Sequence, residues 1–288
     1  MPQLQSLPVV LGGSVARIVR FLILAAVLVF IVTPLVFMLT ASFMPARDII
    51  SMPYRWLSKS LYLQNFHKAI AGYDGLYLFF RSFLNSLVVA TTVSVSTVLL
   101  ASLTGYSLAK FRYRGRNLVF LLIMATMMIP FETIMIPLHM VTIKLKLQNS
   151  YAGMILPFLV SAFGVFMMRQ YFIIFPDEFI DAARVDGMSE FGIYWKVILP
   201  NAGPVVATLF ILAFRGQWDT LLWPLLIAQT EKMKTLPLYI VKFTGDINSD
   251  EGSQMAVALL ASIPMLVLFF SLSKYFISGS AVHSSRKG

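Results

Sequence analysis

Charged side chains inside apolar stretches are the first candidates for chemistry in this 288-residue sequence. Arg215 and Asp219 lie four residues apart in one such stretch, a spacing that places them on one face of a helix. Two interpretations are open: the charges neutralise each other as an ion pair, or they line a path for a polar molecule. The neighbouring Trp218 lies about 100° round the helix from Asp219, so the two side chains face different directions.

Glu132 follows Pro130 in a second apolar stretch, and His139 lies two helical turns further on. A proline frees backbone groups, and polar side chains gather where those groups line a cavity. A proton relay between Glu132 and His139, packing against a partner subunit, and the lining of a cavity are all open. Asn85 opens an earlier apolar stretch, where a helix-to-helix hydrogen bond is its simplest role.

The sequence carries none of the standard catalytic patterns. It contains no cysteine, which excludes disulfides, thiolate chemistry and cysteine-ligated metals. There is no GxxxxGK[ST] phosphate loop, no nucleophile elbow, and no His/Asp/Glu cluster with catalytic-metal spacing. We therefore predict that the chain is no enzyme and has no catalytic site, metal or cofactor. Energy for any driven process must then come from another chain.

The composition is that of a polytopic membrane protein. Hydrophobic residues make up 58% of the chain and charged residues 12%, with a mean hydropathy of +0.79, whereas soluble domains average roughly 25% charged residues. Each of six apolar runs can cross a hydrocarbon core of about 30 Å as a helix, which predicts an all-α membrane protein with six transmembrane helices. The runs are 18–41, 82–108, 118–140, 151–173, 202–227 and 254–277.

Positive charge gathers at the ends of these runs. The net charge of +10 is better explained by lipid headgroups and by topology than by nucleic acid. Four cations between Lys110 and Arg116 favour a cytoplasmic loop and cytoplasmic termini. The first run, Phe21–Leu39, exceeds the length of a signal-peptide core and is interpreted as an uncleaved span. Segments 42–81 and 228–253 then lie outside the cell.

The cytoplasmic segment 174–200 contains two short predicted helices. Pro176 followed by two acidic residues is typical of a helix start, and Gly187 of a helix end. Ser189 is placed to cap a second helix, and Pro200 is expected to start the next span. Two arrangements are open: an amphipathic hairpin lying on lipid headgroups, or a stiff, angled knob that projects from the membrane.

The residues of this segment resemble a known motif. Asp181-Ala-Ala-Arg-Val-Asp-Gly187, followed by Ile198-Leu-Pro200, is similar to the EAA loop in permease subunits of ABC importers. The likeness extends over residues 80–280 and is greatest to the smaller permease of the maltose and glycerol-3-phosphate type, in the carbohydrate-importer branch. The other motifs that carry it are Asn85–Ala90, Tyr106–Asn117, Met127–Pro130, Ile155–Pro157, Trp218-Asp219, Trp223–Leu225 and Thr235–Leu238.

The resemblance implies a type I importer permease whose coupling loop, residues 177–199, inserts into a cleft of a cytoplasmic ATPase subunit. The implied partners are a second permease, two ATPase subunits that hold ATP and Mg, an extracytoplasmic solute-binding protein and the lipid bilayer. The implied domains are a first helix and outer loop (1–80), a five-helix core (81–278) and a tail (279–288). The ATPase-coupling residues that it implies are Asp181, Ala182, Ala183, Arg184, Asp186, Gly187 and Met188. The candidates for the translocation pathway are Asn85, Glu132, Arg215, Trp218 and Asp219.

Three positions depart from the family pattern. Asp181 stands where a glutamate is usual, Asp219 stands where an asparagine is usual, and the 279–288 tail keeps only the closing Lys-Gly. The implied solute is a sugar, oligosaccharide or polyol, with glycerol-3-phosphate or an anionic saccharide as alternatives. An ion-coupled secondary transporter is the rival, but it would normally show paired broken helices or an intramembrane acid in each of two repeats. Neither feature is evident in the sequence.

Overall fold

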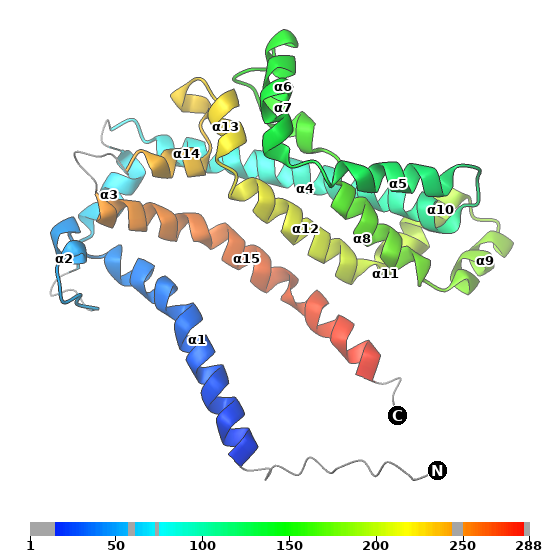
Figure 1. Ribbon diagram of the computed structural model, residues 1–288, viewed down its shortest axis with the longest axis horizontal. Coiled ribbons are helices and arrows are strands. Elements are labelled where there is room, and N and C mark those ends of the chain that lie inside the picture. Colours follow the sequence, from blue (N-terminus) through cyan, green and yellow to red (C-terminus); the bar gives the residue numbers. More distant parts are fainter. Residues whose placement is uncertain (1–14, 57–60, 73–74, 244–249, 285–288) are drawn as a thin grey trace, which may run out of the picture.

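The computed structural model describes residues 15–56, 61–72, 75–243 and 250–284, and the regular elements in these ranges are all helices (Figure 1). The predicted all-α fold is confirmed. Three of the helices are long and apolar enough to cross a membrane unbroken. They are α1 (Val15–Ala41), α4 (Leu78–Lys110) and α15 (Glu251–Ser284).

Each of the other three predicted spans is a bent pair of helices rather than one straight helix. Six spans result only if each bent pair of helices counts as one. The first pair is α5 (Arg116–Thr126) with α6 (Phe131–Lys144), bent by 93°. The second joins α7 (Tyr151–Ile155) and η1 (Leu156–Phe158) to α8 (Ala162–Ile173), with a bend of 43°. The third is 190–201 with α12 (Gly203–Trp218), bent by 81°.

Prolines account for two of the breaks. Pro130 precedes α6 in an extended conformation, and the residue before a proline is disfavoured in the helical region. Pro157 lies in the 3₁₀ segment η1, where the helix changes direction. Pro200 lies in a short helix of its own, and the next span starts instead at Gly203. Hydropathy averages across such breaks and therefore does not register them.

The short elements divide between the two ends of the molecule (Figure 1). One end of α4 carries α9 (Asp177–Val185), α10 (Glu190–Ile193) and α11 (Leu199–Asn201), and the other end carries α2, α3 and α14. Within the predicted outer loop 228–253, residues 244–249 lie outside the described residues, as do Lys287 and Gly288 of the tail. The outer elements are α2 (Ala46–Ile50), α3 (Gln64–Ala71), α13 (Leu222–Ile227), η3 (Glu231–Met233) and α14 (Leu236–Val241).

Helix α4 is the central helix, and α8 and α12 pack along it. α4 and α8 approach each other closely at Gly105. A Cβ added there would lie 2.7 Å from the Cβ of Met168 and 2.8 Å from the backbone nitrogen of Arg169. At the same interface Gly164 lies against Ala101, and a Cβ added at Gly164 would lie 3.1 Å from the Ala101 Cβ. Since packed interiors tolerate no such overlap, any side chain at Gly105 would push α4 and α8 apart.

Helix α1 leaves this packed body at an angle (Figure 1). No residue of its most apolar 18-residue window is buried against the rest of the described chain. Pro34 lies inside the helix, and apolar side chains cover all of its faces. A helix that is apolar all round needs an apolar surrounding, so lipid or another subunit covers α1.

The outer end of α1 is tied to α3 and to the start of α15. The Asn65 side-chain amide donates to the carbonyls of Ser42 at 2.9 Å and Met44 at 2.7 Å. The Lys68 ammonium donates to the Asp250 carboxylate at 2.8 Å. These contacts join segments about 20 and 180 residues apart, so they fix the directions in which two spans leave the outer end.

The charge on Asp250 is stabilised on two sides. Burial opposes its ionisation, but hydrogen bonds from Lys68 and from the Ser253 backbone N–H, at 3.1 Å, hold the pKa of this carboxyl below its usual value. The same bond raises the pKa of Lys68 above its usual value. Asp250 also stands at the N-cap of α15, where a carboxylate satisfies a free N–H group and favours the helix dipole.

We expect Asp250→Asn to lower the free energy of unfolding at pH 7 by about 1 kcal/mol, since a charged hydrogen bond to a partly exposed lysine is lost. Tryptophan fluorescence melting in detergent should show a fall of roughly 2–4 °C. Asp48→Asn is the matched control, because the Arg47–Asp48 pair is exposed at 3.6 Å, and it should leave the melting temperature unchanged.

The pH dependence of this difference follows from the two shifts. A depressed carboxyl pKa contributes stability above the unfolded value, and that contribution is lost as the pH falls through the folded value. A raised lysine pKa contributes stability that is fully present below the pKa of the unfolded state. That contribution is lost as the pH rises through the pKa of the folded state. The difference between wild type and Asp250→Asn should therefore be constant between about pH 5 and 9 and shrink below about pH 4. A constant difference down to pH 2 would contradict the assignment.

Candidate functional site

The first helix of the coupling loop, α9 (Asp177–Val185), begins after Pro176 and ends at Gly187, as predicted. Gly187 has φ of +77°, in the left-handed region that favours glycine. Its N–H donates to the Arg184 carbonyl and that of Met188 to the Ala183 carbonyl, both at 3.0 Å. This pair of bonds is a Schellman motif, which ends a helix and sets the exit direction of the chain.

The second helix, α10 (Glu190–Ile193), is capped by Ser189, as predicted. Its hydroxyl oxygen accepts from the N–H of Gly192 at 3.2 Å. A π-helical turn, η2 (Tyr194–Ile198), and a short helix, α11 (Leu199–Asn201), follow before the 81° bend into α12. The loop is therefore an angled, two-helix knob at the end of α4 (Figure 1).

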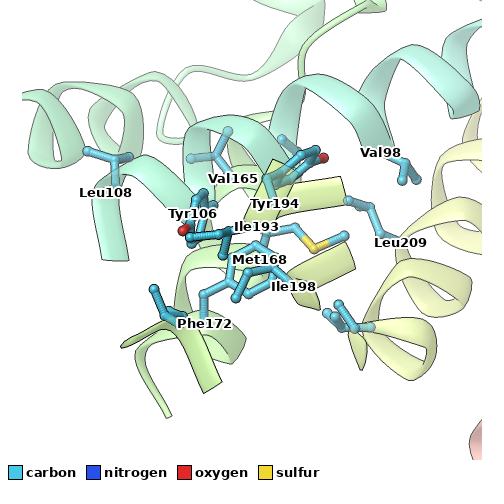
Figure 2. Close-up of a cluster of buried hydrophobic side chains, with 14 of the residues drawn as sticks. Val98, Tyr106, Leu108, Val165, Met168, Phe172, Ile193, Tyr194, Ile198 and Leu209 are labelled. Carbon is cyan, nitrogen blue, oxygen red and sulfur yellow. The ribbon is translucent and has the colours of Figure 1, made fainter. Parts of the chain in front are cut away.

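The inner face of the coupling loop is part of the protein core. Its buried residues pack with side chains of α4, α8 and α12 in one cluster, which Figure 2 shows around Tyr106, Met168 and Tyr194. The Tyr106 and Tyr194 rings lie 5.9 Å apart. The loop residues in this cluster are Ile180, Ala183, Ile193, Tyr194 and Ile198. The knob therefore moves only together with the helices that it contacts.

The predicted coupling residues divide between the two faces. Ala183 is buried, and Met188 is partly buried against the core cluster. The exposed coupling residues are Asp181, Ala182, Arg184, Asp186 and Gly187. Of the two alanines expected to form a close-packing surface, only Ala182 presents one.

Asp181 is paired within the loop. Arg184 donates to Asp181 at 3.0 Å and to Glu190 at 2.7 and 3.3 Å, and it thereby bridges α9 and α10 across Gly187. The bond to Glu190 raises the pKa of Arg184 above its usual value. The role of Glu190 was not evident from the sequence, because its pairing depends on the turn at Gly187.

The start of α9 is attached to the end of α4. Lys110 donates to the Phe175 carbonyl and to the Asp177 carboxylate, both at 2.6 Å. Only 7% of the Lys110 side chain is exposed, so this lysine is committed to the protein and is not a free cation for topology. Its hydrogen bond holds the pKa of Asp177 below the usual value.

Exposed apolar side chains on the outward face of the loop were not predicted. Val185 is 87% exposed, Phe191 66% and Phe179 58%. Large apolar groups on a helix among charged neighbours are typical of a protein contact surface. The sequence did contain one indication of this surface. Val185 is an apolar residue among the charged residues of α9, on the side of the helix opposite Ile180.

Among the pathway candidates, Arg215 and Asp219 form the predicted ion pair at 3.5 Å, with side chains 68% and 61% exposed. Trp218 faces the other way, as its position predicted. It is buried between α12 and α15, and its indole N–H donates to the Ala261 carbonyl at 3.2 Å. The ion pair is therefore accessible from outside this chain, whereas the tryptophan holds two helices together.

Asn85 is buried and makes three hydrogen bonds. Its amide donates to the carbonyls of Lys232 and Lys234, each at 2.9 Å, and its side-chain oxygen accepts from the Tyr151 hydroxyl at 2.6 Å. It lies within α4, two turns after the helix begins at Leu78 rather than at its start. The bond from Tyr151 of α7 is the predicted helix-to-helix hydrogen bond, and the two carbonyl contacts join α4 also to the turn at η3.

Glu132 and His139 occupy different surroundings on α6. Glu132 lies in the exposed first turn, while the His139 ring packs edge-on against Trp223 with centroids 6.4 Å apart. In the described residues, no group of three or more His, Asp or Glu side chains is placed to hold a metal ion.

The comparisons with known proteins agree with this geometry. Residues 97–279 match the family described as "Binding-protein-dependent transport system inner membrane component". The chain is 35% identical over 266 residues to the arabinooligosaccharides transport system permease protein AraQ of Halalkalibacterium halodurans, covering 92% of this chain and 93% of that protein. It is 30% identical over 272 residues to the sn-glycerol-3-phosphate transport system permease protein UgpE of Agrobacterium fabrum, covering 92% and 96%.

A solved structure shows the same fold. It is described as the crystal structure of a bacterial ABC transporter involved in the import of the acidic polysaccharide alginate, and one of its chains matches with a TM-score of 0.80 at 24% identity. The match covers 92% of this chain and 98% of that chain. This chain has bent helix pairs, so the sequence argument against a secondary transporter no longer applies, and the family match favours an importer instead. The chain belongs to the family of binding-protein-dependent transport system inner membrane components, and it is a membrane-spanning permease subunit of an ABC importer.

Proposed function

We propose that this permease forms half of the pathway by which a sugar, oligosaccharide or polyol enters the cell. The relatives that support a carbohydrate are permeases for arabinooligosaccharides in Bacillus subtilis, 36% identical over 210 residues, and for lactose in Rhizobium radiobacter, 34% identical over 197 residues. The observation that carries the transport mechanism is the coupling loop, which offers an apolar outward face while its inner face is packed into the transmembrane body.

An anionic solute is the second candidate. Relatives that transport sn-glycerol-3-phosphate support it, as does the exposed guanidinium of Arg215. Pairing with Asp219 cancels that charge at 3.5 Å, so the surface that this chain offers at that depth is polar but neutral. A neutral carbohydrate, which is recognised by hydrogen bonds and ring stacking, suits such a surface better than an anion does.

The partners follow from what this chain lacks. It has no phosphate loop, so ATP and Mg belong to two separate cytoplasmic ATPase subunits. A second permease completes the pathway and supplies cover for apolar faces such as α1, and an extracytoplasmic binding protein delivers the solute. The exposed side chains of Phe179, Val185 and Phe191 form the surface that we assign to the ATPase.

We assign the coupling loop to the cytoplasmic side of the inner membrane of a bacterial-type cell. Arg112, Arg114 and Arg116 lie beside Lys110 in the neighbouring loop, where positive charge favours the inner side. In Figure 1, α1 and α15 both leave the end of the molecule at which α2 and α3 lie, and α15 runs toward the end that carries the knob. Both termini are therefore assigned to the cytoplasm.

The proposal predicts uptake that depends on ATP and on the binding protein. The permease, copurified with its partner subunits and placed in liposomes, should accumulate the neutral oligosaccharide that its binding protein binds, only with ATP and Mg on the ATPase side. Glycerol-3-phosphate in excess should not compete. Uptake driven by a proton or sodium gradient without any ATPase would contradict the importer mechanism, and competition by glycerol-3-phosphate would favour the anionic alternative.

A second prediction concerns the bend at Gly187. A valine there is strained by about 1–2 kcal/mol, although nothing lies within 4 Å of the added Cβ, so the strain acts on the angle between α9 and α10. We expect Gly187→Val to reduce the solute transported per ATP by about tenfold, the factor that 1.4 kcal/mol represents, while membrane insertion is unchanged. Gly75→Val is the matched control, because Gly75 has φ of +67° and equally open surroundings in the outer segment. Equal effects of the two variants would refute a specific role for the bend.

A third prediction concerns the Arg215–Asp219 pair. Asp219→Asn leaves the guanidinium without its counter-charge, and we expect uptake of a neutral oligosaccharide to fall severalfold. The melting temperature should change little, since an exposed ion pair contributes only about 0–1 kcal/mol. The double variant Arg215→Gln/Asp219→Asn restores neutrality and should recover uptake. If Asp219→Asn transports as well as wild type, the pair does not line the pathway.

A further inference from the structure

Three polar side chains form a line along the cytoplasmic half of α4. Ser102, Tyr106 and Lys110 are spaced by four residues, so they lie on one face of the helix. Each is buried or nearly so, with 0%, 4% and 7% exposed. We call these three residues the α4 seam. Polar groups retained in an apolar core need a partner, and each of them has one in the coupling loop.

The seam contacts the coupling loop along its whole length. The hydroxyls of Ser102 and Tyr194 are 2.6 Å apart, and because Ser102 donates to the Leu99 carbonyl at 3.1 Å, the tyrosine donates in this pair. The Tyr106 hydroxyl donates to Glu190 at 3.4 Å. Lys110 binds at the start of α9, as described above. Figure 2 shows Tyr106 of α4 beside Ile193 and Tyr194 of the loop.

The covalent connections of the loop are poorly suited to transmit a displacement. Toward α8 the chain passes through non-helical residues around Ile174, and toward α12 it turns by 81° after a π-helical turn. Apolar side chains can slide past one another, whereas buried hydrogen bonds hold one register. The α4 seam is therefore the direct mechanical contact between the coupling loop and the transmembrane body.

The far end of α4 is hydrogen-bonded to the outer turn 231–236. Asn85 binds the carbonyls of Lys232 and Lys234, and the Ser86 hydroxyl accepts from the Leu236 N–H at 2.7 Å. α4 is continuous over 33 residues, about 50 Å. It has no interior proline, whereas α1 contains Pro34 and α15 contains Pro264. A straight helix without such a break transmits a displacement from end to end.

We propose that the α4 seam is a set of positioning residues through which the coupling loop displaces α4 as a rigid rod, so that the outer turn 231–236 moves when the ATPase subunits close. This inference rests on the proposed function, because it needs an ATPase to move the loop. Arg184 belongs to the same device, since it holds Glu190 where Tyr106 can reach it. Asn85 acts as the outer attachment of the rod rather than as a solute contact.

The first test is the ratio of solute transported to ATP hydrolysed in the reconstituted complex. Tyr106→Phe removes only the hydroxyl and should lower this ratio about fivefold, the factor that one hydrogen bond contributes to an equilibrium. Tyr171→Phe is the matched control, because its hydroxyl binds the same region from α8, donating to the Asn201 carbonyl at 2.8 Å. It should leave the ratio near that of wild type. Lys110→Met should act like Tyr106→Phe, and Lys110→Arg, which keeps the donor, should restore coupling.

The second test follows the outer turn itself. The chain has no cysteine, so Lys232→Cys provides a single exposed thiol, whose reaction with an impermeant maleimide reports the turn. A non-hydrolysable ATP analogue should change the labelling rate in an otherwise wild-type complex. The change should be lost in Tyr106→Phe/Lys110→Met, although the ATPase still copurifies and the melting temperature matches that of Tyr171→Phe.

The outcomes separate the two proposals. A seam variant that keeps both the wild-type transport ratio and the nucleotide-dependent labelling overturns the role of α4. Val185→Asp, on the outward face, should abolish ATPase binding and with it every nucleotide effect. If the wild-type complex neither holds an ATPase nor responds to the nucleotide analogue, the proposed function fails instead.

Discussion

The close contact between α4 and α8 beside the coupling loop is the constraint on which the rest of the structure depends. At Gly105 the two helices approach so closely that one methyl group would lie 2.7 Å from the Met168 Cβ. This approach brings Tyr106 within reach of Phe172 and Tyr194, with ring centroids 6.1 and 5.9 Å away. The core that receives the coupling loop exists only because the glycine lets these helices meet.

The coupling loop joins two kinds of surface in about 20 residues. Its inner face is apolar, buried and hydrogen-bonded at three points to α4, while its outward face carries Val185 and exposed charges. Such a body cannot shift relative to its own membrane domain without breaking buried hydrogen bonds. A force applied to the outward face therefore passes into the transmembrane helices rather than bending the loop.

The remaining surface is suited to partners of two types. α1 presents apolar side chains all round, which fits lipid or another transmembrane helix. The exposed Arg215–Asp219 pair at the end of α12 is a polar surface with no net charge. The exposed ion pair and the most apolar helix therefore both face away from the core of this chain.

The sequence by itself determined the membrane class, the all-α fold, the ends of α9 and the bend at Gly187. These features depend on local rules: hydropathy over about 20 residues, and the backbone preferences of proline, glycine and capping serine. Only the tertiary structure decided that Ala183 is buried while Ala182 is exposed, and that Asn85 reaches carbonyls nearly 150 residues away. It also decided that Lys110 is bound to α9 rather than free. The physical reason is that burial and hydrogen bonding between distant segments depend on how the helices meet, and no local pattern in the sequence contains that geometry.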